Sequence, residues 1–207
     1  MSRGDKTLSR WYPDLVRLST YPVEEVRNTD AWLMGQDNSV DAFHNALLKM
    51  LKDPSLTVRG NAALSLVRFG DACGRPQIVA LLEPMRLTAA ESGRVVDTAR
   101  VGAAIRQNGL VIKLETNGTT SEVRSPISGR IRTLAVGTGT NVNSGAAIAI
   151  IDPDTEQVWE ALRALYVVGT AEDLPAVAAY ERELPDIPDR VRQQAVLTEQ
   201  AIRQRAK

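Results

Sequence analysis

The amino-acid sequence predicts an α+β protein in which a β domain interrupts a short array of packed helices. Three observations support this fold class. Apolar residues recur at helical spacing near both ends of the chain, Val-Arg segments repeat there, and the middle of the chain changes abruptly to short alternating runs. We therefore expect helices over residues 8–87 and 155–205 and strands over residues 88–153.

The second helical unit has the clearest pattern. Phe43 and Leu47 recur on one helix face, and Asp53-Pro54 then forces the chain into a turn. A second helix follows, in which Ala62-Ala63 lets it approach its partner closely. The segment therefore predicts a helical hairpin.

Similar segments recur elsewhere in the chain. Val26-Arg27 opens a similar stretch thirty-two residues before Val58, and Val191-Arg192 opens another near the end. An Asp-Pro turn followed by Val-Arg and two small residues resembles the HEAT repeat. That resemblance implies a short α-helical solenoid, because one hairpin cannot bury its apolar face alone. We expect Arg27, Arg59 and Arg192 to be structural.

The middle segment contains an internal repeat. It is rich in Gly, Thr, Asn, Val and Ile, and Ser92–Val95 recurs 36 positions later as Ser128–Ile131. Gly109 recurs as Gly145 with the same offset. Alternating runs between turn residues predict strands. Two copies of one β unit are therefore expected.

This repeated segment resembles a known family. Ser125–Ile131, followed by Val136–Gly139 and Val142–Gly145, is similar to biotinyl/lipoyl carrier domains and to the barrel-sandwich hybrids of HlyD-type adaptors. The resemblance implies a β barrel-sandwich hybrid domain. In biotin and lipoyl carriers, the tip of a hairpin presents the lysine that takes the cofactor.

The corresponding hairpin has no lysine at its tip. Asn117-Gly118 is a strong signal for a two-residue hairpin turn, because both residues tolerate positive φ. The resemblance places Gly118 at the acceptor position, and glycine has no amine to acylate. Lys113 is five residues earlier, inside a predicted strand. We therefore expect no covalent cofactor.

The β segment interrupts one helical unit. Helices are predicted over Gln77 to Met85 and over Glu156 to Val168, on either side of the insertion. These two helices would be the halves of one repeat. We expect them to pack together across about 70 intervening residues.

Two single residues are candidates for chemistry. His44, the only histidine, has no second metal ligand at i+3 or i+4, so a surface or groove histidine is the favoured interpretation. Cys73, the only cysteine, is either a reactive thiolate near Arg75 or a small buried turn residue, and we favour the second. We therefore predict no catalytic residue and no metal ligand.

Composition limits the partners and the location. The chain of 207 residues has 25 basic and 25 acidic residues, and this neutral balance argues against nucleic-acid binding. No apolar run reaches the length of about 18 residues that a membrane span needs. The start, Met1 to Lys6, lacks the apolar stretch of a secretory signal. We expect a cytoplasmic protein.

The function predicted from these observations is protein binding. We expect a non-catalytic scaffold or accessory subunit of a larger multi-protein assembly. The alternatives are an enzyme of the HEAT-like lyase type and a carrier domain with a covalent cofactor. The N-terminal aromatic residues either contact partners or cap the first helical unit. The candidate contact residues are Trp11, Tyr12, Tyr21, Trp32, Thr116, Asn117, Gly118, Thr119 and Thr120.

Overall fold

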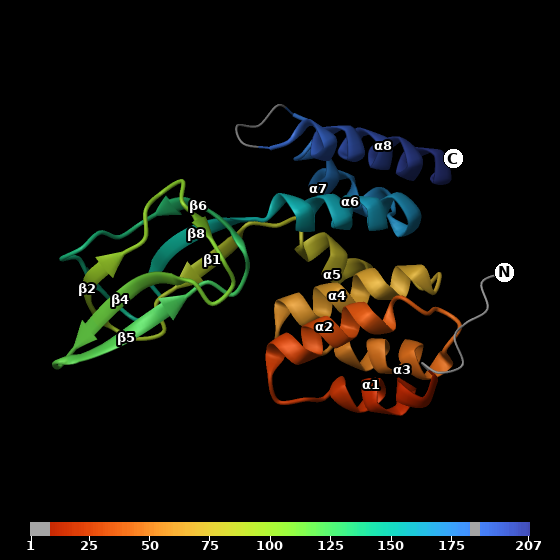
Figure 1. The fold of residues 1–207 in the computed structure, drawn as a ribbon. Helices are drawn as coiled ribbons and strands as arrows, with labels where there is room; N and C mark the ends of the chain where they lie inside the picture. Colours follow the sequence, from red (N-terminus) through yellow and green to blue (C-terminus); the bar gives the residue numbers. More distant parts are fainter. Residues whose placement is uncertain (1–8, 183–186) are drawn as a thin grey trace.

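The computed structural model describes residues 9–182 and 187–207. Leu8, in the first predicted helical region, and residues 183–186, in the second, lie outside the described residues. The described part has the predicted mixture of helices and sheets, with the β domain on one side of the stacked helices (Figure 1). None of its helices is long and apolar enough to cross a lipid bilayer.

The helices lie before and after the β domain in the sequence. A short 3-10 turn, η1 (Ser9–Trp11), precedes the first of them. The helices before the β domain are α1 (Tyr12–Leu18), α2 (Glu24–Met34), α3 (Asp41–Met50), α4 (Leu56–Arg68) and α5 (Arg75–Ala80). Those after it are α6 (Thr155–Val168), the 3-10 turn η2 (Ala171–Asp173), α7 (Leu174–Ala178) and α8 (Asp189–Arg205).

Two helix starts have side-chain caps. The Ser55 hydroxyl accepts a hydrogen bond from the backbone nitrogen of Val58 at 3.4 Å, directly after the Asp53-Pro54 turn. The Asp154 carboxylate accepts from the backbone nitrogen of Glu156 at 2.9 Å. Each cap satisfies a backbone donor that a helix start otherwise leaves unpaired. These caps fix where α4 and α6 begin.

Helix α4 lies between two apolar cores. Ala62 and Leu66 pack with Phe43 of α3 in the N-terminal core. The adjacent Ala63 packs instead with Ile78 and other residues of the C-terminal helical core. Both alanines are fully buried. The small pair therefore allows α4 to pack closely on both sides, whereas the sequence predicted close packing against one partner helix.

Helices α5 and α6 pack against each other across the β insertion, which confirms that prediction. Ile78 and Leu82 share one core with Val158 and Leu162. The Tyr180 hydroxyl also donates to the carbonyl oxygen of Leu82 at 2.7 Å. The two flanking segments therefore form one helical body.

The predicted helix over Gln77 to Met85 is too long. Helix α5 ends at Ala80, and strand β1 already begins at Met85. Pro84 lacks a backbone donor and does not continue a helix, whereas Met85 pairs with Ile151 of the last strand. The first strand therefore starts before the predicted boundary at residue 88.

The strands form two four-stranded antiparallel sheets within the described residues. One sheet has the order β1-β8-β6-β3 and the other β5-β4-β2-β7. A shared apolar core includes residues of both sheets, such as Ile131 and Ile112. The strands are β1 (Met85–Thr88), β2 (Gly93–Thr98), β3 (Ala104–Ile105), β4 (Leu110–Thr116), β5 (Thr119–Arg124), β6 (Gly129–Leu134), β7 (Asn141–Val142) and β8 (Ala147–Pro153).

The two sheets repeat one strand arrangement, as the internal sequence repeat predicts. Exchanging β1 with β5, β2 with β6, β3 with β7 and β4 with β8 converts one strand order into the other. The pairing register of the strands also shifts at the same place in each repeat. The shift lies between Val95 and Asp97 in β2 and between Ile131 and Thr133 in β6. The expected barrel differs in one respect, since the strands of residues 9–182 form no closed barrel.

Gln107, in the loop between β3 and β4, joins the β domain to the helices. Its side-chain nitrogen donates to Glu24 Oε1 of α2, and to Thr57 Oγ1 of α4 at 3.0 Å. Ser55 Oγ donates to the same Glu24 oxygen at 2.5 Å. Leu56 packs against the apolar core of the β domain. Polar and apolar contacts thus hold the β domain against the helices.

Candidate functional site

The β4–β5 hairpin ends in a tight two-residue turn. Thr116 pairs with Thr119, and the two residues between them have positive φ, 52° at Asn117 and 77° at Gly118. Positive φ at both central residues is typical of a type I′ turn, which matches the twist of the strands. The sequence prediction of a hairpin at Asn117-Gly118 is therefore confirmed.

The tip of this hairpin is exposed. Asn117, Gly118, Thr119 and Thr120 are all exposed, and a side chain built at Gly118 would meet no atom within 4 Å. Thr116 is half-buried, and its hydroxyl donates to the carbonyl oxygen of Ser92 at 2.7 Å. The hairpin tip lies at the end of the β domain away from the helices (Figure 1). It is therefore open to a partner molecule.

The hairpin does not fit the attachment of biotin or lipoate. Both groups are carried in an amide bond to a lysine amine, and neither Asn117 nor Gly118 has an amine that can be acylated. Lys113 is in strand β4 rather than in the turn, and its Nζ pairs with Glu122 Oε1 at 3.7 Å. The described residues therefore offer no amine at the tip of the hairpin.

The N-terminal aromatic residues do not form one cluster. Trp11, Tyr21 and Trp32 are each about half-exposed, at 52%, 45% and 51%. Trp32 lines a groove between helices, whereas Tyr21 lies beside a different hollow, next to Pro22 and Lys52. The structure leaves these three residues available for contacts, but at separate places.

Tyr12 has a structural role. It is half-buried, its hydroxyl donates to Asp37 Oδ2 at 2.7 Å, and its ring packs edge-on against Phe43 with centroids 4.8 Å apart. These contacts hold α1 against α3. Of the four aromatic contact candidates, Tyr12 therefore matches the alternative interpretation, in which it caps the first helical unit.

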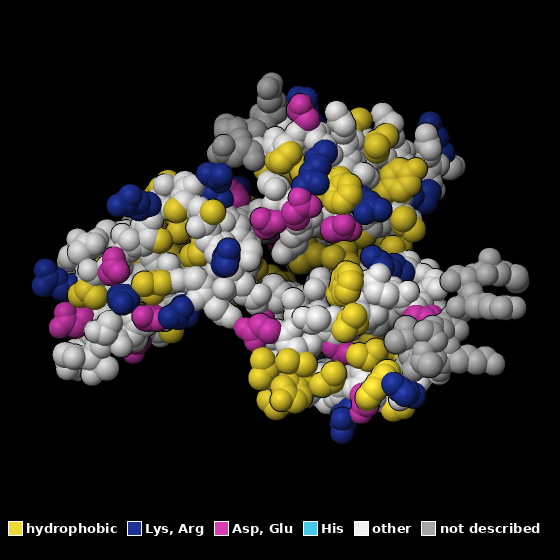
Figure 2. Space-filling model, viewed as in Figure 1, with side chains coloured by type: hydrophobic (Ala, Val, Ile, Leu, Met, Phe, Trp, Pro, Cys, Tyr) yellow, Lys and Arg dark blue, Asp and Glu magenta, His cyan; other side chains and the backbone are white. Residues whose placement is uncertain are grey.

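A groove between α4 and α6 was not predicted from the sequence. It has a volume of about 610 Å³, and α2 and α8 form its outer walls. Its lining residues are spread over the sequence from Trp32 to Leu197, so no local sequence pattern indicates the groove. Figure 2 shows hydrophobic side chains in the hollow between the two helical layers.

His44 and Cys73 both contact the carboxylate of Asp71. His44 Nε2 lies 2.8 Å from Asp71 Oδ2, and the backbone nitrogen of Cys73 donates to Asp71 Oδ1 at 2.8 Å. Desolvation of the sulfur, together with the neighbouring Asp71 carboxylate, raises the pKa of the Cys73 thiol to about 11. Arg75, which the sequence indicated as a partner of a reactive thiolate, pairs instead with Asp173 and Glu172. The thiol is therefore protonated at neutral pH, unlike an activated nucleophile. Cys73 lies in the turn before α5 but is exposed, so the prediction that it is buried is wrong.

The predicted structural arginines make three different kinds of contact. Arg27 makes two hydrogen bonds to the Asp53 carboxylate, at 2.7 and 2.9 Å. Arg59 donates to the carbonyl oxygens of Asp53 and Pro54, and Arg192 pairs with Asp189 of its own helix. Arg27 and Arg59 therefore hold the Asp-Pro turn, whereas the contact of Arg192 among the described residues is within its own helix.

Comparison with known proteins identifies the class of the β domain. Residues 84–151 match the family model Biotin_lipoyl, described as "Biotin-requiring enzyme". The chain therefore contains a biotinyl/lipoyl domain. The family match does not extend to the helices, and the likeness to HlyD-type adaptors stays a prediction. A comparison with curated proteins finds no match.

Solved structures of two carboxylases also match. The Kluyveromyces lactis urea carboxylase is 26% identical over 33% of this chain and 6% of its own, with a TM-score of 0.32. A single-chain, multi-domain long-chain acyl-CoA carboxylase is 19% identical over 47% of this chain and 10% of its own, with a TM-score of 0.33. The match thus spans a small part of either enzyme.

The family match corrects the predicted function. The sequence favoured a non-catalytic scaffold or accessory subunit, and that prediction is wrong. The family matched by residues 84–151 is one of cofactor carriers, which supports the carrier-domain alternative instead. The prediction failed because it gave the missing lysine at Gly118 more weight than the retained carrier fold.

Proposed function

We propose that this chain is a carrier-type component of a biotin- or lipoyl-dependent enzyme system. In this role the β domain presents its β4–β5 hairpin to the enzymes that act on a carrier domain. The family match over residues 84–151 is the observation on which the proposal rests. The exposed turn at Asn117-Gly118, at the far end from the helices, supports it.

The proposal assigns no covalent group to the hairpin. Gly118 takes the position at which the resemblance places the acceptor lysine, and the hairpin keeps the exposure and the tight turn that an acceptor site needs. The hairpin therefore keeps the presentation of a carrier domain, although position 118 has no amine to acylate. Its partners in this proposal are proteins of a larger assembly.

We also propose that the helices form a HEAT-like array that holds the β domain. The same kind of hydrogen bond joins the helices of two pairs, which supports this proposal. Ser65 Oγ of α4 donates to the carbonyl oxygen of Ala31 in α2 at 2.8 Å. Thr198 Oγ1 of α8 donates to the carbonyl oxygen of Leu162 in α6 at 2.9 Å. Both hydroxyls are buried, so these hydrogen bonds hold α4 against α2 and α8 against α6.

Restoring the missing amine tests the carrier proposal. The full-length chain and a Gly118→Lys variant are incubated with a biotin protein ligase, ATP and biotin, or with a lipoate ligase and its substrates. We expect Gly118→Lys to gain the mass of one biotinyl or lipoyl group, because the turn already presents position 118 to solvent. The wild-type chain should gain no mass in intact mass spectrometry.

A second lysine variant is the matched control. Gly137 is also in a turn with open space around it, but outside the hairpin, so Gly137→Lys should stay unmodified. If folded Gly118→Lys is not modified by either ligase, the carrier-like surface is not retained and the proposal is wrong. A mass gain on the wild-type chain would contradict the assignment of an empty hairpin.

A further inference from the structure

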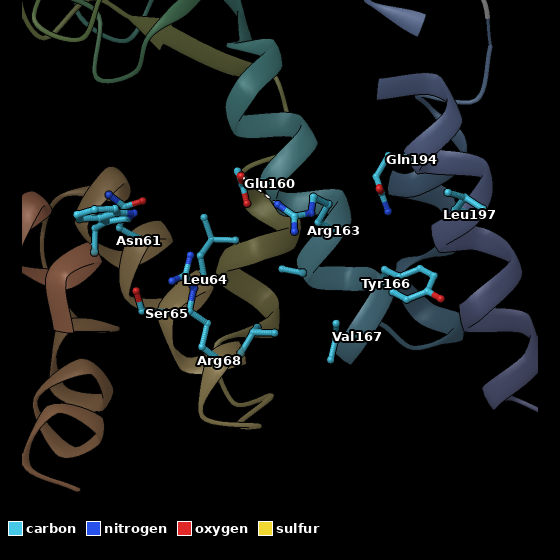
Figure 3. Close-up of a pocket in the computed structure, with 13 residues that line it drawn as sticks. Asn61, Leu64, Ser65, Arg68, Glu160, Arg163, Tyr166, Val167, Gln194 and Leu197 are labelled. Atoms are coloured by element: carbon cyan, nitrogen blue, oxygen red, sulfur yellow. Dashed lines mark hydrogen bonds and ion pairs between the residues drawn. The ribbon is translucent and has the colours of Figure 1, made fainter. Parts of the chain in front are cut away.

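The groove between α4 and α6 lies outside the carrier domain and has no role in the proposed function. Leu64 and Arg68 face it from α4, while Arg163 and Val167 face it from α6 (Figure 3). Trp32 of α2 closes one side, and α8 closes the other. All four helices contribute side chains, so the groove depends on the complete helical body.

Large apolar side chains in this groove are exposed to solvent. Trp32 is 51% exposed, Val167 55% and Leu197 51%, and Tyr166 adds a second aromatic ring at the rim. Exposed apolar groups gathered in a concave place mark interaction sites more often than the same groups scattered singly. Aromatic side chains are also enriched among the residues that dominate binding energy.

The charged residues of the groove favour an acidic partner. Arg68 and Arg163 are basic, and Glu160 is its one acidic lining residue within the described chain. Glu160 is already paired with Arg163 at 3.4 Å. Arg68 instead donates to the neutral Gln36 amide oxygen at 2.8 Å. The groove therefore has a net positive charge beside its apolar strip.

The walls of the groove select the shape of the partner. Helices satisfy their own backbone hydrogen bonds, so α4 and α6 offer no strand edge for an extended peptide to join. The groove runs along residues 61–68 of α4 and 160–167 of α6, and eight helical residues are about 12 Å long. An amphipathic helix places apolar residues at i, i+3, i+4 and i+7 on one face, and these positions span about 11 Å, which matches that length.

We infer that this groove binds an amphipathic helix of a protein partner. The apolar face of the helix packs on Trp32, Leu64 and Val167, and one of its carboxylates pairs with Arg68. This surface is separate from the hairpin of the β domain. The chain therefore has two binding surfaces, one on each of its structural parts.

Two peptides that differ only in charge test this inference. One labelled synthetic peptide of about four turns has Leu and Phe on one face and Glu on its flanks, and the second has Lys in place of Glu. Fluorescence anisotropy measures the binding of each to the full-length chain. We expect the acidic peptide to bind at least about tenfold more tightly than the basic peptide, with the difference decreasing at high salt.

Two variants and two matched controls locate the site. Trp32→Ala and Arg68→Glu should each weaken binding of the acidic peptide by about tenfold. Trp11→Ala removes an equally exposed tryptophan outside the groove, and Arg17→Glu reverses an exposed charge on α1. Both controls should bind like the wild-type chain. Circular dichroism checks that every variant is folded.

Several results would overturn the inference. Equal binding of the acidic and basic peptides would show that the charge of the groove does not select the partner. If the acidic peptide does not bind at all, the groove is not a binding site for such a helix. Equal losses in Trp32→Ala and Trp11→Ala would place binding elsewhere. A dimer in sedimentation velocity that Trp32→Ala abolishes would show that a second copy of the chain covers the groove instead.

Discussion

Arg75 Nη1 donates a hydrogen bond to Asp173 Oδ1 at 2.7 Å, although the two residues are 98 positions apart. Arg75 begins α5, before the β domain, and Asp173 ends η2, after it. The Asp173 side chain is only 5% exposed, so this ion pair is largely shielded from solvent on the carboxylate side. The ion pair joins the two halves of the helical body across the insertion.

Removing this arginine should destabilise the protein strongly. Arg75→Met leaves the Asp173 carboxylate buried without its cation, which we expect to lower the free energy of unfolding by about 3 kcal/mol. Urea denaturation measures the change. Arg192→Met, which removes an exposed pair within one helix, is the control and should cost less than about 1 kcal/mol. Equal losses in the two variants would show that the buried pair has no special role.

Asp30 should make the protein less stable as the pH rises. Its side chain in α2 is buried, both carboxylate oxygens lack a hydrogen-bond partner among the described residues, and burial raises its pKa to about 7. Because the unfolded carboxyl ionises near pH 3.8, the folded state binds the extra proton between those values. The cost of ionisation therefore develops between pH 3.8 and about 7 and remains above it.

The Asp30→Asn variant removes this ionisation. We expect it to raise the free energy of unfolding by about 3 kcal/mol at pH 8, with the difference disappearing near pH 3.5. Urea denaturation across this pH range is the measurement. The exposed Asp97 is the control, since Asp97→Asn should not produce a similar pH-dependent gain. A gain for Asp30→Asn that is equal at both pH values would contradict the predicted ionisation.

Gly129 should not tolerate a side chain. It lies in strand β6, and a Cβ atom there would be 1.8 Å from the carbonyl oxygen of Asp152 in β8. Gly129→Ala must separate two paired strands and should lower the free energy of unfolding by about 3 kcal/mol. Gly137→Ala, which meets no atom within 4 Å, should change it by less than about 0.5 kcal/mol. Thermal unfolding followed by circular dichroism compares them, and similar melting temperatures would contradict the predicted clash.

Local sequence patterns predicted the elements of this fold well. Asn117-Gly118 predicts its turn because positive φ is a property of those residues themselves, and Asp53-Pro54 ends a helix for a similarly local reason. The repeat of Ser92–Val95 as Ser128–Ile131 predicts a doubled β unit because each copy folds into the same strands.

Properties that depend on distant contacts were harder to predict. Trp32 and Leu197 meet in one groove only because four helices pack side by side, and no spacing in the sequence records that packing. Arg75 was placed beside Cys73 because the two are near in sequence, whereas its partners come from beyond the β domain. The scaffold function was predicted from the missing lysine, the neutral charge and the lack of catalytic residues, although the family match of residues 84–151 favours a carrier domain.

The first and last strands of the β domain are direct neighbours, with Met85 opposite Ile151. The chain therefore enters and leaves this domain at nearly the same point on the helical body. A domain attached in this way is a cassette, which recombination can remove or exchange while α5 and α6 stay in place. Helical bodies of this kind could therefore exist with other cassettes, or with a plain loop, between the same two helices.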